Sequence, residues 1–187
     1  MSIVREQTRK QRYDSKKKIA KQYPLHIATI NFMFEDNLGF LIRSAACFGL
    51  KSVMVIGSIP DRKLINPTSG SLLDYVKIKQ FSTPSKFLEH VRENNIELVS
   101  AEFTDDSTPL EKFKFSKIKE SCIVVGHEEI GVPIEVLLNS KNVHIPMPGI
   151  GYCLNTSQTG NIMIYEAIKQ LDSFSHQGVT KGLKNEK

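Results

Sequence analysis

Two short apolar runs, at 122–126 and 143–147, constrain the fold of this chain more than any other feature. Each run is followed by a turn rich in glycine or proline and then by a helix-like pattern. Apolar runs of this length between turns indicate buried strands, and strands that alternate with helices form parallel sheets. Ligands of such sheets bind at the carboxyl ends of the strands, so the two turns predict a small-molecule site.

The rest of the chain repeats this alternation of strand and helix. We expect further strands at 25–32, 52–57, 76–81 and 96–103, and helices at 39–49, 72–75, 85–95, 133–140 and 155–174. The stretches 66–71 and 104–120 contain the proline, serine and other polar residues typical of loops. The predicted fold class is therefore α/β, with a mostly parallel sheet flanked by helices.

Composition narrows the class of protein. The chain has 187 residues, of which 40% are hydrophobic, and no apolar run approaches the roughly 18 residues that a membrane span needs. These values predict one soluble domain without a membrane partner, and no signal peptide is visible. Cys47, Cys122 and Cys153 are odd in number and widely separated, which favours neither disulfides nor a zinc site. We expect a reducing cytoplasm as the location.

Positive charge is concentrated at the start of the chain. Residues 1–22 hold eight basic and two acidic side chains, whereas the rest of the chain holds 17 basic and 18 acidic ones. Because few apolar residues accompany these charges, we expect a flexible basic arm at 1–22, a folded domain at 23–175 and a tail at 176–187. The arm is either a solvated tail or a contact to nucleic-acid phosphates, with a membrane surface as a third alternative.

Several standard sites are absent from the sequence. It has no Walker A sequence, no HExxH and no nucleophile elbow, and its five histidines do not fall at metal-ligand spacings, so we expect no metal. What remains is a polar set at strand-to-helix junctions or in first helical turns: Asn37, Arg43, Glu128, Asn155 and Ser157. These residues are candidates for a site, or else helix caps and a structural ion pair between Arg43 and Glu128.

Three blocks of sequence sharpen this choice. They are NLGFLIRSAACFGLKSVMVIG at 37–57, VVGHEEIGVP at 124–133 and IPMPGIGYCLNTSQTGNIMIYE at 145–166. In order and spacing they resemble the three signature motifs of the SpoU (TrmH) family of RNA methyltransferases, within the SPOUT superfamily. The resemblance covers roughly residues 25–172.

The resemblance implies both a fold and a function. It implies a deep trefoil knot in the C-terminal part of the chain, a rare exception to unknotted topology. It further implies binding of S-adenosylmethionine, a homodimer with the active site near the subunit interface, and methylation of a ribose 2′-oxygen in tRNA or rRNA. By motif, the catalytic set would be Arg43, Glu128, Asn37 and Asn155, and the cofactor contacts, largely through the backbone, would be Gly126, Ile145, Leu154, Met147 and Cys153.

The chemistry implied for the arginine needs one adjustment. In this family an arginine has been assigned the role of general base, but a guanidinium with a pKa above roughly 12 rarely deprotonates. We therefore expect Arg43 to bind the adjoining phosphate and polarise the hydroxyl, with Glu128 orienting it. We also expect a branched side chain at Gly126 to block the cofactor while leaving the fold intact.

The chain departs from the family pattern at Cys153, where the usual residue is serine, a better hydrogen-bond donor than a thiol. This departure leaves a second function class open, a non-catalytic RNA-binding paralogue with the same fold. A nucleotide-dependent metabolic enzyme is a third class, which the missing phosphate-binding loops disfavour.

Overall fold

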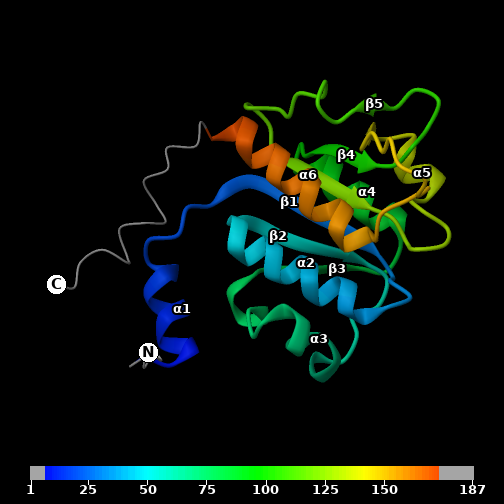
Figure 1. Ribbon diagram of the computed structural model, residues 1–187. Helices are drawn as coiled ribbons and strands as arrows, with labels where there is room; N and C mark the ends of the chain where they lie inside the picture. Colours follow the sequence, from blue (N-terminus) through cyan, green and yellow to red (C-terminus); the bar gives the residue numbers. More distant parts are fainter. Residues whose placement is uncertain (1–6, 173–187) are drawn as a thin grey trace.

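Seven parallel strands form one sheet in the computed structural model, which describes residues 7–172 (Figure 1). The strands are β1 (Tyr23–Ile30), β2 (Leu50–Ile56), β3 (Ile78–Phe81), β4 (Glu97–Ala101), β5 (Thr108–Pro109), β6 (Ser121–Val125) and β7 (Lys141–His144). Their order across the sheet is β3-β2-β1-β6-β4-β7-β5, and all neighbours pair in parallel. The predicted α/β class with a mostly parallel sheet is confirmed, whereas the knot stays a prediction.

Helices cover both faces of this sheet. They are α1 (Arg9–Lys17), α2 (Glu35–Phe48), α3 (Arg62–Ser69), α4 (Pro84–Glu93), α5 (Ile134–Leu137) and α6 (Thr156–Leu171), with a 3-10 turn η1 (Leu73–Tyr75). On one face, α2 and α6 lie side by side (Figure 1), and Leu41 and Ile164 join the strand residue Ile27 in a buried core. On the other face, Phe87 of α4 packs with Ala28. Consecutive strand residues therefore supply opposite cores, as the alternation of a pleated strand requires.

The contact between α2 and α6 is close because of a glycine. A Cβ at Gly160 would lie 2.7 Å from Leu41 Cδ2, so any larger residue would displace the buried Leu41 side chain. Ser44 Oγ also donates a hydrogen bond to Asn161 Oδ1 across the same contact, at 2.5 Å. This packing fixes the middle of α2 against the first turns of α6. The beginnings of both helices contribute to the site described below.

The structure corrects the sequence-based prediction at α3. Residues 66–71 were expected to form a loop because they contain Pro67 and Gly70, yet α3 continues to Ser69 and includes Pro67. The Asp61 side chain accepts a hydrogen bond from the Lys63 amide, which caps the helix at its start. Ile65 is buried in the core beneath the helix. Capping and burial therefore outweigh the helix-breaking tendency of Pro67.

The other differences concern the ends of elements. The helix predicted at 133–140 is the short α5, and the irregular stretch 104–120 contains the two-residue strand β5. α6 ends at Leu171, so the last residues of the helix predicted to 174, and the predicted tail at 176–187, lie outside the described residues. None of the helices within residues 7–172 is long and apolar enough to cross a membrane.

The basic segment before β1 contains the helix α1, which Figure 1 shows outside the two helical layers. Thr8 and Gln11 close a capping box at its start, and none of its residues is buried. Tyr13 connects it to the rest of the chain, because its hydroxyl donates to Gly70 O at 3.1 Å and its ring meets Tyr75 edge-on. The predicted limits and flexibility of the arm at 1–22 stay predictions.

Candidate active site

The carboxyl ends of three neighbouring strands form the candidate site. In the order of the sheet, β4 lies between β6 and β7, so the segments that follow these strands begin next to one another. Gly126 follows β6, Glu102 follows β4, and Ile145 follows β7. The sheet thus brings the two turns predicted from the sequence to one edge, where parallel sheets usually bind ligands.

Glu128 is the central acceptor of this site. Its Oε2 accepts a hydrogen bond from the Met33 amide at 2.9 Å, and its Oε1 accepts one from Asn37 Nδ2 at 2.5 Å. Partial burial acts to raise the pKa of the Glu128 carboxyl, but hydrogen bonds from the Met33 and Phe34 amides, its own amide and Asn37 together outweigh it, so the pKa lies below its ordinary value. Glu128 is therefore an ionised carboxylate at neutral pH.

A directed chain of hydrogen bonds connects Glu128 to the start of α6. Asn155 caps α6, because its Oδ1 accepts from the amides of Ser157 and Gln158 at 2.9 and 3.3 Å. Its Nδ2 is then the donor to Asn37 Oδ1, at 3.0 Å, and Asn37 Nδ2 in turn donates to the carboxylate. The backbone amides of α6 must donate to Asn155 Oδ1, and the Glu128 carboxylate must accept from Asn37 Nδ2. The oxygen and nitrogen positions of both asparagine side chains are therefore determined.

The structure therefore gives Asn37 and Asn155 a role that sequence alone left undecided. Asn155 is a helix cap, as one alternative held, but it also belongs to the site through Asn37. Asn37 is buried, with 3% of its surface exposed, and its N–H₂ group holds Glu128 in place. Ser157, the fifth polar candidate, donates its hydroxyl to Asn155 Oδ1 at 2.6 Å and so supports the cap.

Gly126 allows two backbone segments to approach each other. A Cβ at this position would lie 2.4 Å from the Gly131 carbonyl carbon and 2.7 Å from the Val132 nitrogen, which are backbone atoms that cannot swing aside. The Gly126 carbonyl also accepts a hydrogen bond from Thr156 Oγ1 at 2.8 Å. Our expectation that a branched residue here would leave the fold intact is therefore wrong: the first collision is with the 131–132 backbone rather than with a ligand.

The other predicted cofactor residues lie in the segment between β7 and α6. Ile145 is half-buried against the core, whereas Met147 and Leu154 expose 41% and 37% of their surface. Cys153 is an exposed free thiol. Every residue from 146 to 155 is exposed, so this segment offers apolar side chains and backbone amides to a ligand.

These features suit S-adenosylmethionine. Exposed Met147 and Leu154 can pack on the faces of an adenine ring, as the apolar lining of cofactor sites does. The carboxylate of Glu128, held at the same edge by Asn37, complements the positive charge of a sulfonium. Within residues 7–172 no cluster of three or more histidine, cysteine, aspartate or glutamate side chains is arranged to hold a metal.

Arg43 lies apart from this hydrogen-bonded chain. It follows Asn37 by six residues on α2, a rise of about 9 Å along the helix, and its side chain is exposed. A Cβ at Gly70 would lie 3.6 Å from Arg43 Nε, so the guanidinium runs beside the end of α3. Among the described residues no hydrogen bond or ion pair joins Arg43 to Glu128, which does not favour the structural ion pair considered from the sequence.

Sequence reasoning missed three contributors to the site. Glu102 follows β4 directly, and its Oε2 accepts a hydrogen bond from the Val132 amide at 3.1 Å, which fixes the loop after β6. The Met33 amide and the Thr156 hydroxyl are the other two. Glu102 could have been found, because a carboxylate next to the carboxyl end of an apolar strand meets the same criterion that selected Glu128. The Met33 amide carried no sequence signal.

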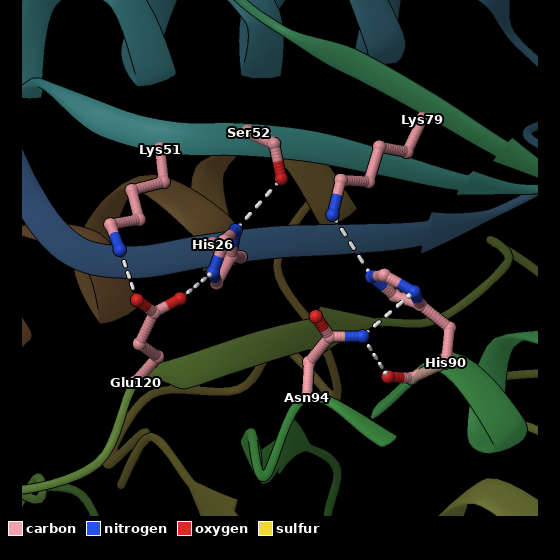
Figure 2. A network of polar contacts seen from close by, with 7 residues as sticks. All are labelled: His26, Lys51, Ser52, Lys79, His90, Asn94 and Glu120. Carbon is pink, nitrogen blue, oxygen red and sulfur yellow. Dashed lines mark hydrogen bonds and ion pairs between the residues drawn. The ribbon is translucent and has the colours of Figure 1, made fainter. Parts of the chain in front are cut away.

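A second polar cluster lies at the opposite, amino-terminal ends of the strands (Figure 2). His26 Nδ1 is hydrogen-bonded to Ser52 Oγ at 2.7 Å, and His26 Nε2 is hydrogen-bonded to Glu120 Oε2 at 2.8 Å. Lys51 forms an ion pair with the other carboxylate oxygen of Glu120. The residue types resemble a hydrolase triad, but Ser52 is only 1% exposed and no substrate can reach its hydroxyl. The cluster is therefore structural.

This cluster predicts a pH dependence of stability. Burial lowers the pKa of His26 from its ordinary value of 6.5, against the opposing effect of Glu120, and burial also lowers the pKa of His90. Below about pH 6.5 the unfolded chain then binds more protons than the folded one. The contribution of the neutral histidines to the free energy of unfolding is therefore complete above that pH and is lost as the pH falls. We expect the free energy of unfolding in urea to fall between about pH 7.5 and about pH 5.5.

Variants identify the groups responsible. His26→Gln keeps a donor for Glu120 but cannot titrate, so the fall in stability should be smaller, and smaller still when His90→Gln is added. A wild-type stability that is constant over this pH interval would contradict the assignment.

The fold and the site together define an α/β protein with a ligand site at the carboxyl ends of parallel strands, built around an ionised carboxylate. The model of the SpoU rRNA Methylase family matches residues 24–165, and the chain belongs to this family. The family resemblance predicted from three sequence blocks is thereby confirmed.

Individual relatives agree with this assignment. The chain is 30% identical over 141 residues to the 23S rRNA (guanosine-2′-O-)-methyltransferase RlmB of Acinetobacter baylyi, over 72% of this chain and 55% of that protein. It is 22% identical over 135 residues to the tRNA (guanosine(18)-2′-O)-methyltransferase of Escherichia coli strain K12, over 72% of this chain and 58% of that protein. The chain thus spans somewhat more than half the length of these relatives.

A solved structure shows the same fold. The AdoMet-bound rRNA methyltransferase from Sinorhizobium meliloti superposes with a TM-score of 0.74 at 20% identity, over 81% of this chain and 58% of that one. Since the identity is low, this likeness establishes the fold and not the activity.

Proposed function

We propose that the protein transfers a methyl group from S-adenosylmethionine to a ribose 2′-hydroxyl of tRNA or rRNA. The observation that carries the proposal is the hydrogen-bonded chain from Asn155 through Asn37 to Glu128, at the end of the sheet where β6, β4 and β7 meet. It is supported by membership of the SpoU rRNA Methylase family and by relatives named for methylation of tRNA or rRNA.

Bound at this edge, S-adenosylmethionine would supply a methyl group already activated by the sulfonium. The task of the chain is then to position the hydroxyl and receive its proton. Glu128 is suited to this task because it is ionised and can only accept hydrogen bonds. During methyl transfer Glu128 would receive the hydroxyl proton and pass it to solvent.

Asn37 and Asn155 hold the acceptor still. The cap of α6 fixes Asn155, and Asn155 fixes Asn37, so Glu128 does not have to be ordered when substrate binds. Arg43 supplies the positive charge that binds an RNA phosphate, since it is exposed and has no carboxylate partner among the described residues. We therefore assign the proton to Glu128 and the phosphate to Arg43.

The test is methyl transfer itself. The protein is incubated with S-adenosylmethionine labelled in the methyl group and with total RNA, and the labelled nucleotide is mapped. We expect label on a ribose 2′-oxygen, at one position or a few. RNA binding without cofactor binding would favour the RNA-binding paralogue, and a protein that binds neither cofactor nor RNA would contradict the proposal.

We also propose that α1 supports RNA binding through its charge. Tyr13 docks α1 on Gly70, and Gly70 lies beside Arg43, so the exposed cations of α1 lie on the same side as the proposed phosphate site. This arrangement extends the positive surface along an RNA backbone.

Neutralising part of this helix tests the idea. We replace Arg9, Lys10, Lys16 and Lys18 together by glutamine, which spares Tyr13 and its contacts. RNA affinity should fall, and the log–log dependence of affinity on salt should flatten by up to about 3, at about 0.7 per phosphate contact of a single strand. The matched control replaces Lys112, Lys114, Lys117 and Lys119, which changes net charge equally elsewhere. Equal effects in both variants would refute a specific role for α1.

We further propose a homodimer that works in the cytoplasm. Support for a dimer comes from large apolar side chains exposed on the α2–α6 layer, where Phe40 exposes 42% and Ile162 exposes 40% of its surface. The cores of homodimer interfaces are more apolar than the rest of a protein surface, and aromatic residues are enriched in them. Sedimentation of the wild type and of Ile162→Asp tests it, since the variant should be monomeric.

Support for the cytoplasm comes from Cys47, Cys122 and Cys153, which are all free.

A further inference from the structure

We propose that a cleft between the ends of β1 and β2 receives the nucleobase of the target nucleotide, an inference that rests on the proposed function. The cleft has a volume of about 220 Å³. Its floor is apolar and buried, formed by Ile30, Leu38 and Val55. Leu64, which is 53% exposed, and Phe32 complete the apolar lining.

The size and lining of the cleft suit one flat ring system. Pockets for drug-sized ligands hold roughly 300–1,000 Å³, so this cleft is too small for a whole nucleoside cofactor but fits a single base. Bases that enzymes take out of a stack are held between apolar or aromatic side chains and read by polar groups at their edges. Phe32 and Leu64 supply the first kind of contact.

Three polar residues that line the cleft, Asn31, Glu35 and Ser58, are exposed. Asn31 Oδ1 accepts hydrogen bonds from the Ser58 amide and hydroxyl, at 2.7 and 3.4 Å, so its N–H₂ group is left as a donor. Glu35 is exposed at the first position of α2 and supplies a carboxylate. A carboxylate accepts two parallel hydrogen bonds from adjacent N–H groups, and among the four RNA bases guanine offers such a pair on its Watson–Crick edge. The cleft therefore favours guanine.

The cleft adjoins the proposed proton acceptor. Leu38 on its floor follows Asn37 directly, so their Cα atoms are about 3.8 Å apart, and Asn37 donates to Glu128. Phe32 precedes Met33, whose amide donates to the same carboxylate. One short turn between β1 and α2 thus forms both a wall of the cleft and a support of Glu128. A nucleotide with its ribose at Glu128 would direct its base into the cleft.

Nucleotide binding can be measured without the cofactor and without methyl transfer. The full chain is labelled in its leucine and valine methyl groups and titrated with GMP while NMR spectra are recorded. We expect shifts at Leu38, Val55 and Leu64, and none at Leu138, which directly follows α5. Ribose 5-phosphate, which lacks a base, should not produce them, and UMP should bind less tightly than GMP. Absence of shifts at tens of millimolar GMP, or equal shifts with ribose 5-phosphate, would overturn the proposal.

Variants connect the shifts to the cleft. Leu64→Trp fills the cleft from its exposed side, so GMP should bind at least about tenfold more weakly, whereas Leu138→Trp, at a residue 78% exposed elsewhere, should leave affinity unchanged. Glu35→Gln should reduce the preference for GMP over UMP without unfolding the chain. Unaltered GMP affinity in the Leu64 variant would overturn the proposal. If GMP binds as expected but no RNA is methylated, the proposed function fails, and the cleft remains a guanine site without a methylated target.

Discussion

Arg43→Ala is expected to lower the rate of methyl transfer by roughly 10²-fold or more, with nearly unchanged affinity for S-adenosylmethionine. The physical reason is the position of the side chain. Arg43 is exposed on α2, about 9 Å along the helix from Asn37, and it makes no ion pair within residues 7–172 that its loss would disrupt. Its removal should therefore affect the RNA phosphate and not the cofactor.

Three measurements make this test specific. Single-turnover methyl transfer gives the rate, cofactor calorimetry gives the affinity, and urea unfolding reports the fold. Arg43→Lys keeps the charge without the bidentate fork and should recover only part of the rate. Arg92→Ala on α4, at the other face of the sheet, is the matched control and should have wild-type activity. Full activity of Arg43→Ala would remove Arg43 from the site.

Gly126→Ala is expected to abolish measurable binding of S-adenosylmethionine and to lower the free energy of unfolding by about 1–3 kcal/mol. A single methyl group suffices, because it would lie 2.4 Å from the backbone of Gly131 and force the 126–132 loop to move. The loop carries Glu128 and is fixed by Glu102, so its displacement should disturb both the proposed proton acceptor and the proposed cofactor site.

Calorimetry and urea unfolding check this expectation. The matched control for stability is Gly149→Ala, where a Cβ would meet nothing within 4 Å, so unfolding should be unchanged. Cofactor affinity near that of the wild type in a folded Gly126→Ala protein would show that the loop after β6 does not form the cofactor site.

The sequence predicted the strands better than the helices. Buried parallel strands such as β1 and β6 are rich in apolar residues, a local signal that does not depend on the tertiary arrangement. α3 was missed because Pro67 and Gly70 indicate a turn locally, while the capping by Asp61 and the burial of Ile65 that stabilise the helix depend on the folded structure.

For the site, sequence reasoning identified most members but not their arrangement. Asn37, Glu128 and Asn155 were selected by position and motif, yet nothing local indicates that Asn37 bonds to both of the others. Arg43 was grouped with Glu128, although the two do not touch. The cleft between β1 and β2 had no sequence signal, because it is formed by segments that become neighbours only when the strands pair.

The sheet order also bears on how the chain reaches this structure. Ala28 pairs with Val124, and the bond from Asn155 to Asn37 spans 118 residues, so the middle of the sheet joins segments far apart in sequence. Long-range pairing of this kind slows folding, because the entropy of closing a large loop is lost before the contacts form. On a ribosome, β1 has no partner in β6 until residue 125 has emerged, and Glu128 lacks its complete hydrogen-bonded support until α6 follows. The site can thus be complete only after α6 has been made.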